Sequence, residues 1–529
     1  MTEFSVVPSE TQGGGHPNVT ITQAFEYDNS TDSVKDAFVR LQPGLLGNPQ
    51  SAAFCSQEQF SADSCPDDST IGSVVVRAHA VLLPLLPLTN NGTVYNLTPT
   101  GDEPARVGVV VEAAGGLEKI FLQSPVYIRP GSDGYGLEST FADQPRNAGL
   151  DIQIERIALT FNGGASKGSF MRMPTACAEG TSLTRANSWE AQDAFSQLTY
   201  AMTPTGCERL PFGPRADGYV GSPETTARAS FPPVGTTLRF DPEEAALKRA
   251  EVTLPTVLSP NLSAVGRACT RAQSDASACP ATSRVGTATI DSPLQPRPVR
   301  GPVYLGYNTD SALPGLVVML PPPVGVRLDG VVDVSGEGIR NTFASNPDLP
   351  VRSFALELDG GTGGALQLNR NLCDDGIDRT MQATLVAHNG KQVSFEQELA
   401  TPGCDPRATV SIRRRGRRAT LIARLKAASD GPAITSFGLR LPKTLRRGRT
   451  RPFVLAEGRQ MKPLSRTRLA SMPFPGSVRS ATVVWRGLRT GRRLRRTAVV
   501  RLTMTDTRDK ATLLKPRVRV RGKAPRGRR

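Results

Sequence analysis

Short apolar runs recur along the whole chain, and each is bounded by glycine, proline, asparagine or aspartate. Clear examples are residues 71–83 (IGSVVVRAHAVLL), 106–116 (RVGVVVEAAGG), 326–336 (VRLDGVVDVSG) and 352–361 (RSFALELDGG). Runs of this length that are rich in β-branched residues and end at turn-forming residues predict β-strands. Helical periodicity is weak nearly everywhere, so the pattern predicts an all-β protein built from sandwich domains.

One segment with partly helical spacing is also better explained by strands. Residues 189–202 (WEAQDAFSQLTYAM) have that spacing, whereas the matching segment at 380–399 alternates like a hairpin around Asn389-Gly390. Asn-Gly is a strong signal for a type I′ turn. Because duplicated segments should share their structure, we expect strands in both places.

The cysteines show that the chain contains an internal duplication. Eight cysteines form two sets of four, with spacings of 10 and 30 residues in the first set and 10 and 31 in the second. The flanking text also matches, CSQEQFSADSCPDDSTIGSVVV against CTRAQSDASACPATSRVGTATI. Each copy is long enough to form an independent domain with its own core.

The duplication and the composition together divide the chain into six parts. We predict an N-terminal arm (1–17), repeat 1 (18–208), a Pro/Gly-rich linker (209–234), repeat 2 (235–405), an Arg-rich basic module (406–520) and a disordered basic tail (521–529). The basic module alternates as strands do. Its segment ITSFGLRLPKTL, from Ile434, resembles the opening strand of the repeats, so a third, cysteine-free relative of the same sandwich is expected.

An even, repeated set of cysteines favours disulfides and an oxidising compartment. Zinc sites use short Cys-x2-4-Cys spacings, which do not occur here, and reduced core thiols rank second. Four cysteines in each copy allow three pairings. We expect the local one, which joins Cys55 to Cys65, Cys177 to Cys207, Cys269 to Cys279 and Cys373 to Cys404.

Charge is distributed very unevenly along the chain. Residues 405–529 hold 36 Lys or Arg and 5 Asp or Glu, whereas residues 1–404 hold 28 and 43. Some arginines could simply protect strand edges and turns, but a local net charge of +31 exceeds that need. We therefore predict that the basic module binds a polyanion. The candidate residues are Arg413, Arg414, Arg415, Arg417, Arg418, Arg446, Arg447, Arg449, Arg492, Arg493, Arg495 and Arg496.

Signals for catalysis or metal binding are weak. Residues 164–168 match the G-x-S-x-G nucleophile pattern, but the context predicts a hairpin loop rather than the strand–turn–helix that a nucleophile elbow needs. The acidic groups fit no calcium loop, and neither they nor the histidines suggest a site, so we expect no metal and no cofactor. The residues considered are His16, His79, His388, Asp28, Asp32, Asp36, Asp374, Asp375 and Asp378.

The beginning of the chain has neither the basic nor the apolar segment of a secretory leader. A leader upstream, another export route or a cytosolic location would each explain this, and we expect the upstream leader. The longest apolar run, residues 81–88, is too short to span a bilayer and contains two prolines. A transmembrane segment is therefore not expected.

Three stretches carry a family resemblance. They are FSVVPSETQGGGHPNVT (4–20), the L-P-G-L-x-G-N-P-like stretch at 41–49, and the C-P-x-x-S-x-V-G signature at 65–72, with isoleucine for valine, and at 279–286. Over roughly residues 4–405 the chain resembles exported cell-surface repeat proteins of high-GC Gram-positive bacteria. The resemblance implies an extracellular location and brings no activity, ligand or catalytic residue.

These observations favour a non-enzymatic, exported protein of the cell envelope. Its basic module would attach to an anionic wall polymer, lipid headgroups or an acidic glycan. An exported hydrolase with a site in the sandwich loops is the first alternative. A nucleic-acid-binding protein is the second, and it applies if the protein is intracellular, although no aromatic stacking set or reader motif occurs.

Overall fold

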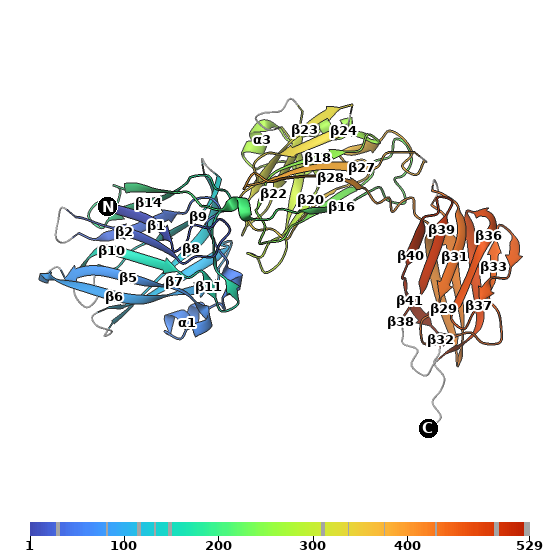
Figure 1. Cartoon of the computed structure of the whole chain (residues 1–529), viewed down its shortest axis with the longest axis horizontal. Coiled ribbons are helices and arrows are strands. Elements are labelled where there is room, and N and C mark those ends of the chain that lie inside the picture. Colours follow the sequence, from blue (N-terminus) through green and yellow to red (C-terminus); the bar gives the residue numbers. More distant parts are fainter. Residues whose placement is uncertain are drawn as a thin grey trace, which may run out of the picture.

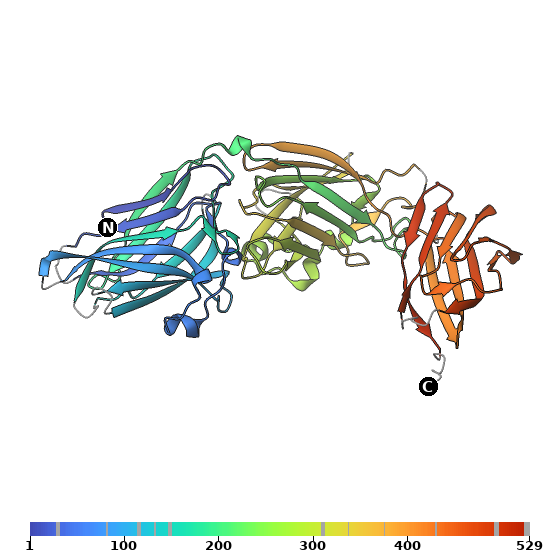
Figure 2. The ribbon, with the colours of Figure 1, turned by 60° about the horizontal axis from the view of Figure 1, so that its bottom comes forward.

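The computed structural model contains three β-rich bodies, which follow one another along the long axis of the molecule (Figures 1 and 2). They correspond to repeat 1, repeat 2 and the basic module, so the predicted all-β fold class, with duplicated disulfide-stapled domains before a basic β-domain, is confirmed. The structure describes residues 1–27, 32–80, 83–113, 118–131, 134–146, 151–307, 313–336, 338–374, 376–428, 431–490 and 497–522.

Repeat 1 is one eleven-stranded antiparallel sheet that folds over on itself. Its two edges meet where Gln12 forms a parallel bridge to Thr205, so the apolar faces of the two halves enclose the core. In spatial order the strands are β1 (Glu3–Pro8), β2 (Val19–Ala24), β10 (Ile152–Phe161), β5 (Thr70–Ala80), β6 (Leu83–Leu97), β7 (Ala105–Ala113), β8 (Glu118–Gly131), β9 (Gly134–Phe141), β3 (Val34–Arg40), β14 (Gly180–Ser188) and β15 (Ser196–Met202). Short pairs join β4 (Leu46–Gly47) to β13 (Met171–Arg172) and β11 (Gly164–Ala165) to β12 (Gly168–Ser169).

Repeat 2 has the same strand order, element for element. A parallel bridge between Tyr219 and Ala400 brings its edges together as in repeat 1. The strands are β16 (Arg215–Val220), β17 (Val234–Arg239), β25 (Ser353–Leu358), β20 (Arg284–Asp291), β21 (Val299–Gly306), β22 (Gly315–Met319), β23 (Arg327–Ser335), β24 (Gly338–Phe343), β18 (Leu247–Leu254), β27 (Thr380–Ala387) and β28 (Gln392–Glu398), with β19 (Leu258–Pro260) paired to β26 (Leu366–Leu368).

Both repeats need a glycine at an equivalent position, where two neighbouring strands approach each other closely. Gly72 in β5 and Gly286 in β20 each follow a shift in the strand register. A Cβ atom at these positions would lie 2.1 Å from the Thr160 carbonyl oxygen and 2.2 Å from that of Glu357. This steric requirement explains why the cysteine signature of both repeats ends in glycine.

Four disulfides join Cys55 to Cys65, Cys177 to Cys207, Cys269 to Cys279 and Cys373 to Cys404, which is the local pairing. The ten-residue loops enclose equivalent short helices, α1 (Gln57–Ser61) and α3 (Arg271–Asp275). Each helix begins with a capping box, from Ser56 and Gln59 in α1 and from Thr270 and Gln273 in α3. Within the described residues, the other helical segments are η1 (Pro49–Ser51), η2 (Asp67–Ser69), η4 (Cys207–Arg209), α2 (Leu262–Val265) and η5 (Ala281–Ser283).

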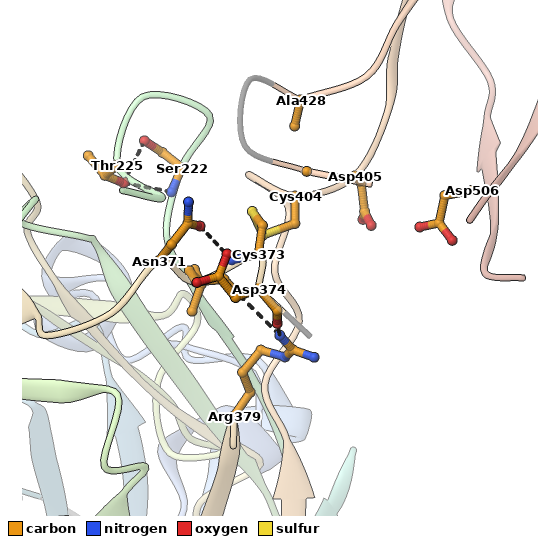
Figure 3. The surroundings of a disulfide bond; sticks show 12 residues. Ser222, Thr225, Asn371, Cys373, Asp374, Arg379, Cys404, Asp405, Ala428 and Asp506 are labelled. Carbon is orange, nitrogen blue, oxygen red and sulfur yellow. Dashed lines mark hydrogen bonds between the residues drawn. A yellow bond between two sulfur atoms is a disulfide. The ribbon is translucent and has the colours of Figure 1, made fainter. Parts of the chain in front are cut away.

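The last disulfide lies where repeat 2 passes into the basic module (Figure 3). Asn371 accepts a hydrogen bond from the backbone N–H of Cys373, and Arg379 donates to the carbonyl oxygen of Leu372. On the other side of the bridge, Asp405 pairs with Lys510 at 2.9 Å. The junction between repeat 2 and the basic module is thus held by a disulfide and by hydrogen bonds that involve the backbone.

Three predicted segments differ from the structure. The expected N-terminal arm, 1–17, contains β1, which is an edge strand of repeat 1 and pairs along its whole length with β2. The expected linker, 209–234, contains the equivalent strand β16, which pairs with β17. Composition misled here, because Pro and Gly mark the turns that flank these strands while backbone pairing forms the strands themselves. The predicted tail, 521–529, also begins too early, because Arg521 ends a strand and residues 523–529 lie outside the described residues.

The hairpin at Asn389-Gly390 forms, but its turn differs from the expected type I′. Only Gly390 has a positive φ, of 83°, and its N–H donates to the carbonyl oxygen of Ala387. This is a type I turn followed by a left-handed glycine. The difference places the Asn389 amide against repeat 1, where it donates to the carbonyl oxygens of Cys207 and Leu210.

The repeats are joined by buried polar contacts. Asp348 of repeat 2 is 6% exposed and accepts hydrogen bonds from the backbone N–H groups of Thr175 and Ala176 and from the Thr175 hydroxyl. The Tyr135 hydroxyl of repeat 1 contacts the backbone of Arg327 in repeat 2. A buried carboxylate with three donors fixes a geometry that a loose linker would not.

The basic module is a sandwich of two sheets around a core that includes the fully buried Trp485. One sheet contains β34 (Arg459–Met461), β33 (Phe453–Ala456), β37 (Ser480–Thr490), β30 (Arg418–Lys426), β29 (Arg407–Arg415), β41 (Arg517–Arg521) and β38 (Thr497–Val499), with β32 (Leu445–Arg446) also paired to β37. The other contains β35 (Leu464–Ser465), β36 (Leu469–Val478), β31 (Ile434–Arg440), β39 (Arg501–Asp506) and β40 (Ala511–Leu514).

The expected third copy of the repeat is therefore wrong at the level of topology. The strand–turn–strand at residues 434–446 does resemble the opening of the repeats, but it sits in a two-sheet arrangement with another strand order. The similar sequence therefore forms a similar strand–turn–strand, but it does not determine the strand order of the surrounding domain. In the part of the chain that the structure describes, no helix has the length and apolarity needed to cross a bilayer.

Candidate functional site

The strand register of the basic module aligns four arginines side by side. Arg415 of β29 is paired with Arg418 of β30, Arg418 with Arg489 of β37, and Arg489 with Arg446 of β32. All four are exposed. Directly paired residues lie on one face of a sheet, and neighbouring strands are about 4.8 Å apart, so this arginine row spans roughly 14 Å.

Two more arginines extend the row into a patch. Arg413 lies two residues before Arg415 on the same face of β29, and the parallel register pairs it with Arg521 of β41. Both are exposed. The β29–β30 hairpin, β32 and the ends of β37 and β41 thus converge at one end of the module, the lower end of the orange-to-red body in Figure 1.

These six arginines have no carboxylate partner within ion-pair distance among the described residues. The few acidic groups of the module lie elsewhere. Asp405 pairs with Lys510 beside repeat 2, and Asp506 is fully buried and receives Arg508. Like charges placed directly opposite each other on a sheet are destabilising, so the fold tolerates a repulsion that its own carboxylates do not relieve.

Edge protection does not explain the patch. The strands β29, β30 and β37 each have a hydrogen-bonded neighbour on both sides. Charges that block unwanted strand pairing are needed on edge strands, so Arg413, Arg415, Arg418 and Arg489 are not required for it. A row of guanidinium groups instead offers repeated two-pronged hydrogen-bond donors, which suit phosphate or carboxylate groups along a polymer.

The structure separates the candidate arginines of the sequence analysis. Arg413, Arg415, Arg418 and Arg446 belong to the patch, Arg417 is exposed in the turn beside it, and Arg449 is exposed beyond β32. Two others are engaged with the backbone, because Arg414 donates to the Gly416 carbonyl oxygen and Arg447 to that of Ser465. The remaining candidates, Arg492, Arg493, Arg495 and Arg496, lie outside the described residues.

Sequence reasoning missed two members of the patch. Arg521 was recognisable from the alternation in PRVRVRG, which puts Arg517, Arg519 and Arg521 on one face. Arg489 had no such signal, because its place beside Arg418 and Arg446 depends on the register of β37 with two other strands.

The weak catalytic candidates do not form a site in the described residues. The G-x-S-x-G match is the β11–β12 hairpin, where the Ser166 hydroxyl donates to the Asp68 carbonyl oxygen at 2.7 Å. The His16 and His388 rings bond to the carbonyl oxygens of Met171 and Asn346. His79 lies 3.0 Å from the Glu155 carboxylate.

Three of the acidic candidates serve local structure. Asp32 and Asp378 accept hydrogen bonds from the nearby backbone N–H groups of Ser33 and Thr380, and Asp36 pairs with Lys35. No group of three His, Cys, Asp or Glu side chains suited to a metal ion occurs within the described ranges, which include Asp374 but not Asp28 or Asp375.

No family model matches this chain, and no curated protein matches it significantly in sequence. Solved structures similar to it include the collagen adhesin from S. aureus, at 8% identity and a TM-score of 0.18, covering 58% of this chain and 92% of that one. The N-terminal domain of an adhesin from Streptococcus gordonii is similar at 8% identity and a TM-score of 0.19, covering 97% and 100%. The major pilin subunit of Bacillus cereus is similar at 9% identity and a TM-score of 0.17, and the match covers 75% of this chain and 93% of the pilin.

Proposed function

We propose that this chain is a non-enzymatic, exported protein of the cell envelope, whose basic module attaches it to an anionic surface polymer or to anionic lipid headgroups. The arginine row carries the proposal. Four unpaired, exposed arginines in register across a sheet are costly to the fold unless an external anion neutralises them.

The remaining features fit a role outside the cytoplasm. Four disulfides hold the two repeats and suit an oxidising compartment. The repeats share strands, glycines and disulfides, and their described histidines and acidic candidates are engaged in local contacts. The repeats would then form a stapled arm, and the basic module would hold that arm at the surface.

The test uses the full chain with Arg415→Gln and Arg418→Gln together, a directly paired couple at one end of the row. Each basic residue near an anionic membrane contributes about 1 kcal/mol to binding, so the double variant should bind phosphatidylglycerol vesicles roughly 30-fold more weakly. Purified Gram-positive cell walls, used in parallel, distinguish a wall polymer from lipid as the stronger ligand.

A matched control exists in the same module. Arg440 and Arg501 are also exposed and directly opposed, but they lie on the other sheet. Arg440→Gln with Arg501→Gln makes the same change in net charge and should weaken binding far less. Equal losses in the two double variants, or retention that does not respond to salt, would sink the proposal.

A further inference from the structure

The interior of repeat 1 contains a cavity of about 240 Å³. Its walls come from both halves of the folded sheet and are mainly apolar, with Ile21, Val39, Val109, Leu122 and Leu159 as representatives. A minority of polar residues, such as Gln23 and Glu138, also line it. Protein interiors are normally packed to the density of organic crystals, with few voids larger than a water molecule. A void of this size in a core of valine, isoleucine and leucine therefore needs an explanation.

The cavity is long and narrow. All five inward-facing residues of β7 line it, which are Ala105, Val107, Val109, Val111 and Ala113. They cover eight residue steps of an extended strand, or roughly 26 Å. A volume of about 240 Å³ distributed along such a length describes a tube, which suits a flexible chain better than a compact ring.

Side chains along the tube are left partly exposed although they point inward. Val39, Leu122, Phe141, Ile157 and Leu159 all line the cavity, and none of them is fully buried. Apolar side chains that face an unfilled space lose the dispersion contacts that packing would give them. An aliphatic occupant would restore those contacts without needing hydrogen bonds.

Repeat 2 has the same fold, but larger side chains occupy part of the corresponding space. Its corresponding cavity is smaller, about 140 Å³. Because Val109 pairs with Val94 as Val318 pairs with Val303, the positions of Val107 and Val111 correspond to those of two leucines, Leu316 and Leu320. Both leucines line the smaller cavity, so an added methylene at each position narrows it. At these two positions repeat 1 thus has the smaller residue of each equivalent pair.

We propose that repeat 1 binds a single long alkyl chain, such as a lipid tail, in this interior tube. The inference is independent of the basic module and of the polymer that the module binds. It depends on the length, the aliphatic lining and the contrast with the duplicated domain.

The test replaces Val107→Leu and Val111→Leu in the full chain, which introduces the residues that the same fold already accommodates in repeat 2. Binding of a fluorescent long-chain fatty acid is measured by titration, with displacement by dodecane, by dodecanoic acid and by a lysophospholipid. We expect one site on the unaltered protein, displacement by dodecane, and at least tenfold weaker binding to the variant. The two lipid competitors distinguish a free fatty acid from a lipid with a headgroup.

The reverse exchange, Leu316→Val with Leu320→Val, is the control, and it should leave the affinity of the first site unchanged. Melting curves confirm that both variants are folded. Failure of the unaltered protein to bind the probe, failure of dodecane to displace the bound probe, or equal affinity in the folded leucine variant would each overturn the proposal.

Discussion

The repeats and the basic module use arginine on sheets in opposite ways. In repeat 1, the register places Arg40 of β3 opposite Glu138 of β9, and the two form an ion pair at 2.7 Å. In the basic module, the register places Arg415 opposite Arg418 and leaves both without a carboxylate among the described residues. Charge pairing therefore supports the register in the repeats, whereas hydrophobic packing must hold the register of the basic module against repulsion. The comparison separates a part that is stabilised by opposite-charge pairs from a part whose opposed arginines have no such pairs among the described residues.

The two parts also differ in how they are stapled. All four disulfides lie in the repeats, while the basic module relies on a core around Trp485. The chain has two tryptophans, Trp189 in repeat 1 and Trp485 in the basic module. Versions that keep one tryptophan each would report separately on the unfolding of the two parts.

The largest effect should come from removing a staple. Cys177→Ala with Cys207→Ala opens a loop of 30 residues and should lower the free energy of unfolding of repeat 1 by about 3 kcal/mol. Urea denaturation followed through Trp189 measures this loss, and the Trp485 transition should stay in place. A comparable shift of the Trp485 transition would show that the two parts do not unfold separately.

The second effect concerns the junction that makes the repeats one unit. Asp348→Asn keeps the shape of the side chain but removes the charge that receives three hydrogen bonds. Hydrogen bonds to charged groups contribute about 1.5–3 kcal/mol, so the free energy of unfolding of repeat 1 should fall by roughly 2 kcal/mol. Asp329→Asn, in the more exposed pair with Arg327, is the control and should change it by less than about 1 kcal/mol.

The third effect is a change in stability that has opposite signs in the basic module and in repeat 1. Arg415→Gln with Arg418→Gln relieves repulsion and should stabilise the basic module by roughly 0.5–1 kcal/mol, although it weakens binding to anions. Arg40→Gln breaks a cross-strand pair and should destabilise repeat 1 by a similar amount. The gain in the basic module should shrink as salt is added, because salt screens the repulsion in the unaltered protein. Destabilisation by both variants would remove the contrast between the two parts.

The sequence alone predicted the features that depend on residues close together in the chain. The cysteine spacing gave the duplication and the disulfide pairing, and alternating residues gave most strands, including Arg517 to Arg521. It missed β1 and β16, because proline and glycine in the flanking turns suggested an arm and a linker, whereas pairing with β2 and β17 forms the strands. The arginine row and the interior tube depend on which strands lie side by side, and a single sequence does not state that register.

The smallest effect is a pH dependence confined to repeat 1. Burial alone would raise the pKa of Glu103, but hydrogen bonds from Arg106 and Thr100 outweigh burial and hold the pKa below its ordinary value of 4.5. A carboxyl whose pKa is lowered by folding contributes stability that is fully present above its unfolded pKa and is lost as the pH falls through the folded pKa. Repeat 1 should therefore lose stability below about pH 4.5, as followed through Trp189. Glu103→Gln should be less stable than the unaltered protein near pH 7 and should show a flatter decline on acidification. An unchanged acid limb in this variant would mean that other carboxylates set the acid stability of repeat 1, and the Trp485 signal should not respond to the substitution at any pH.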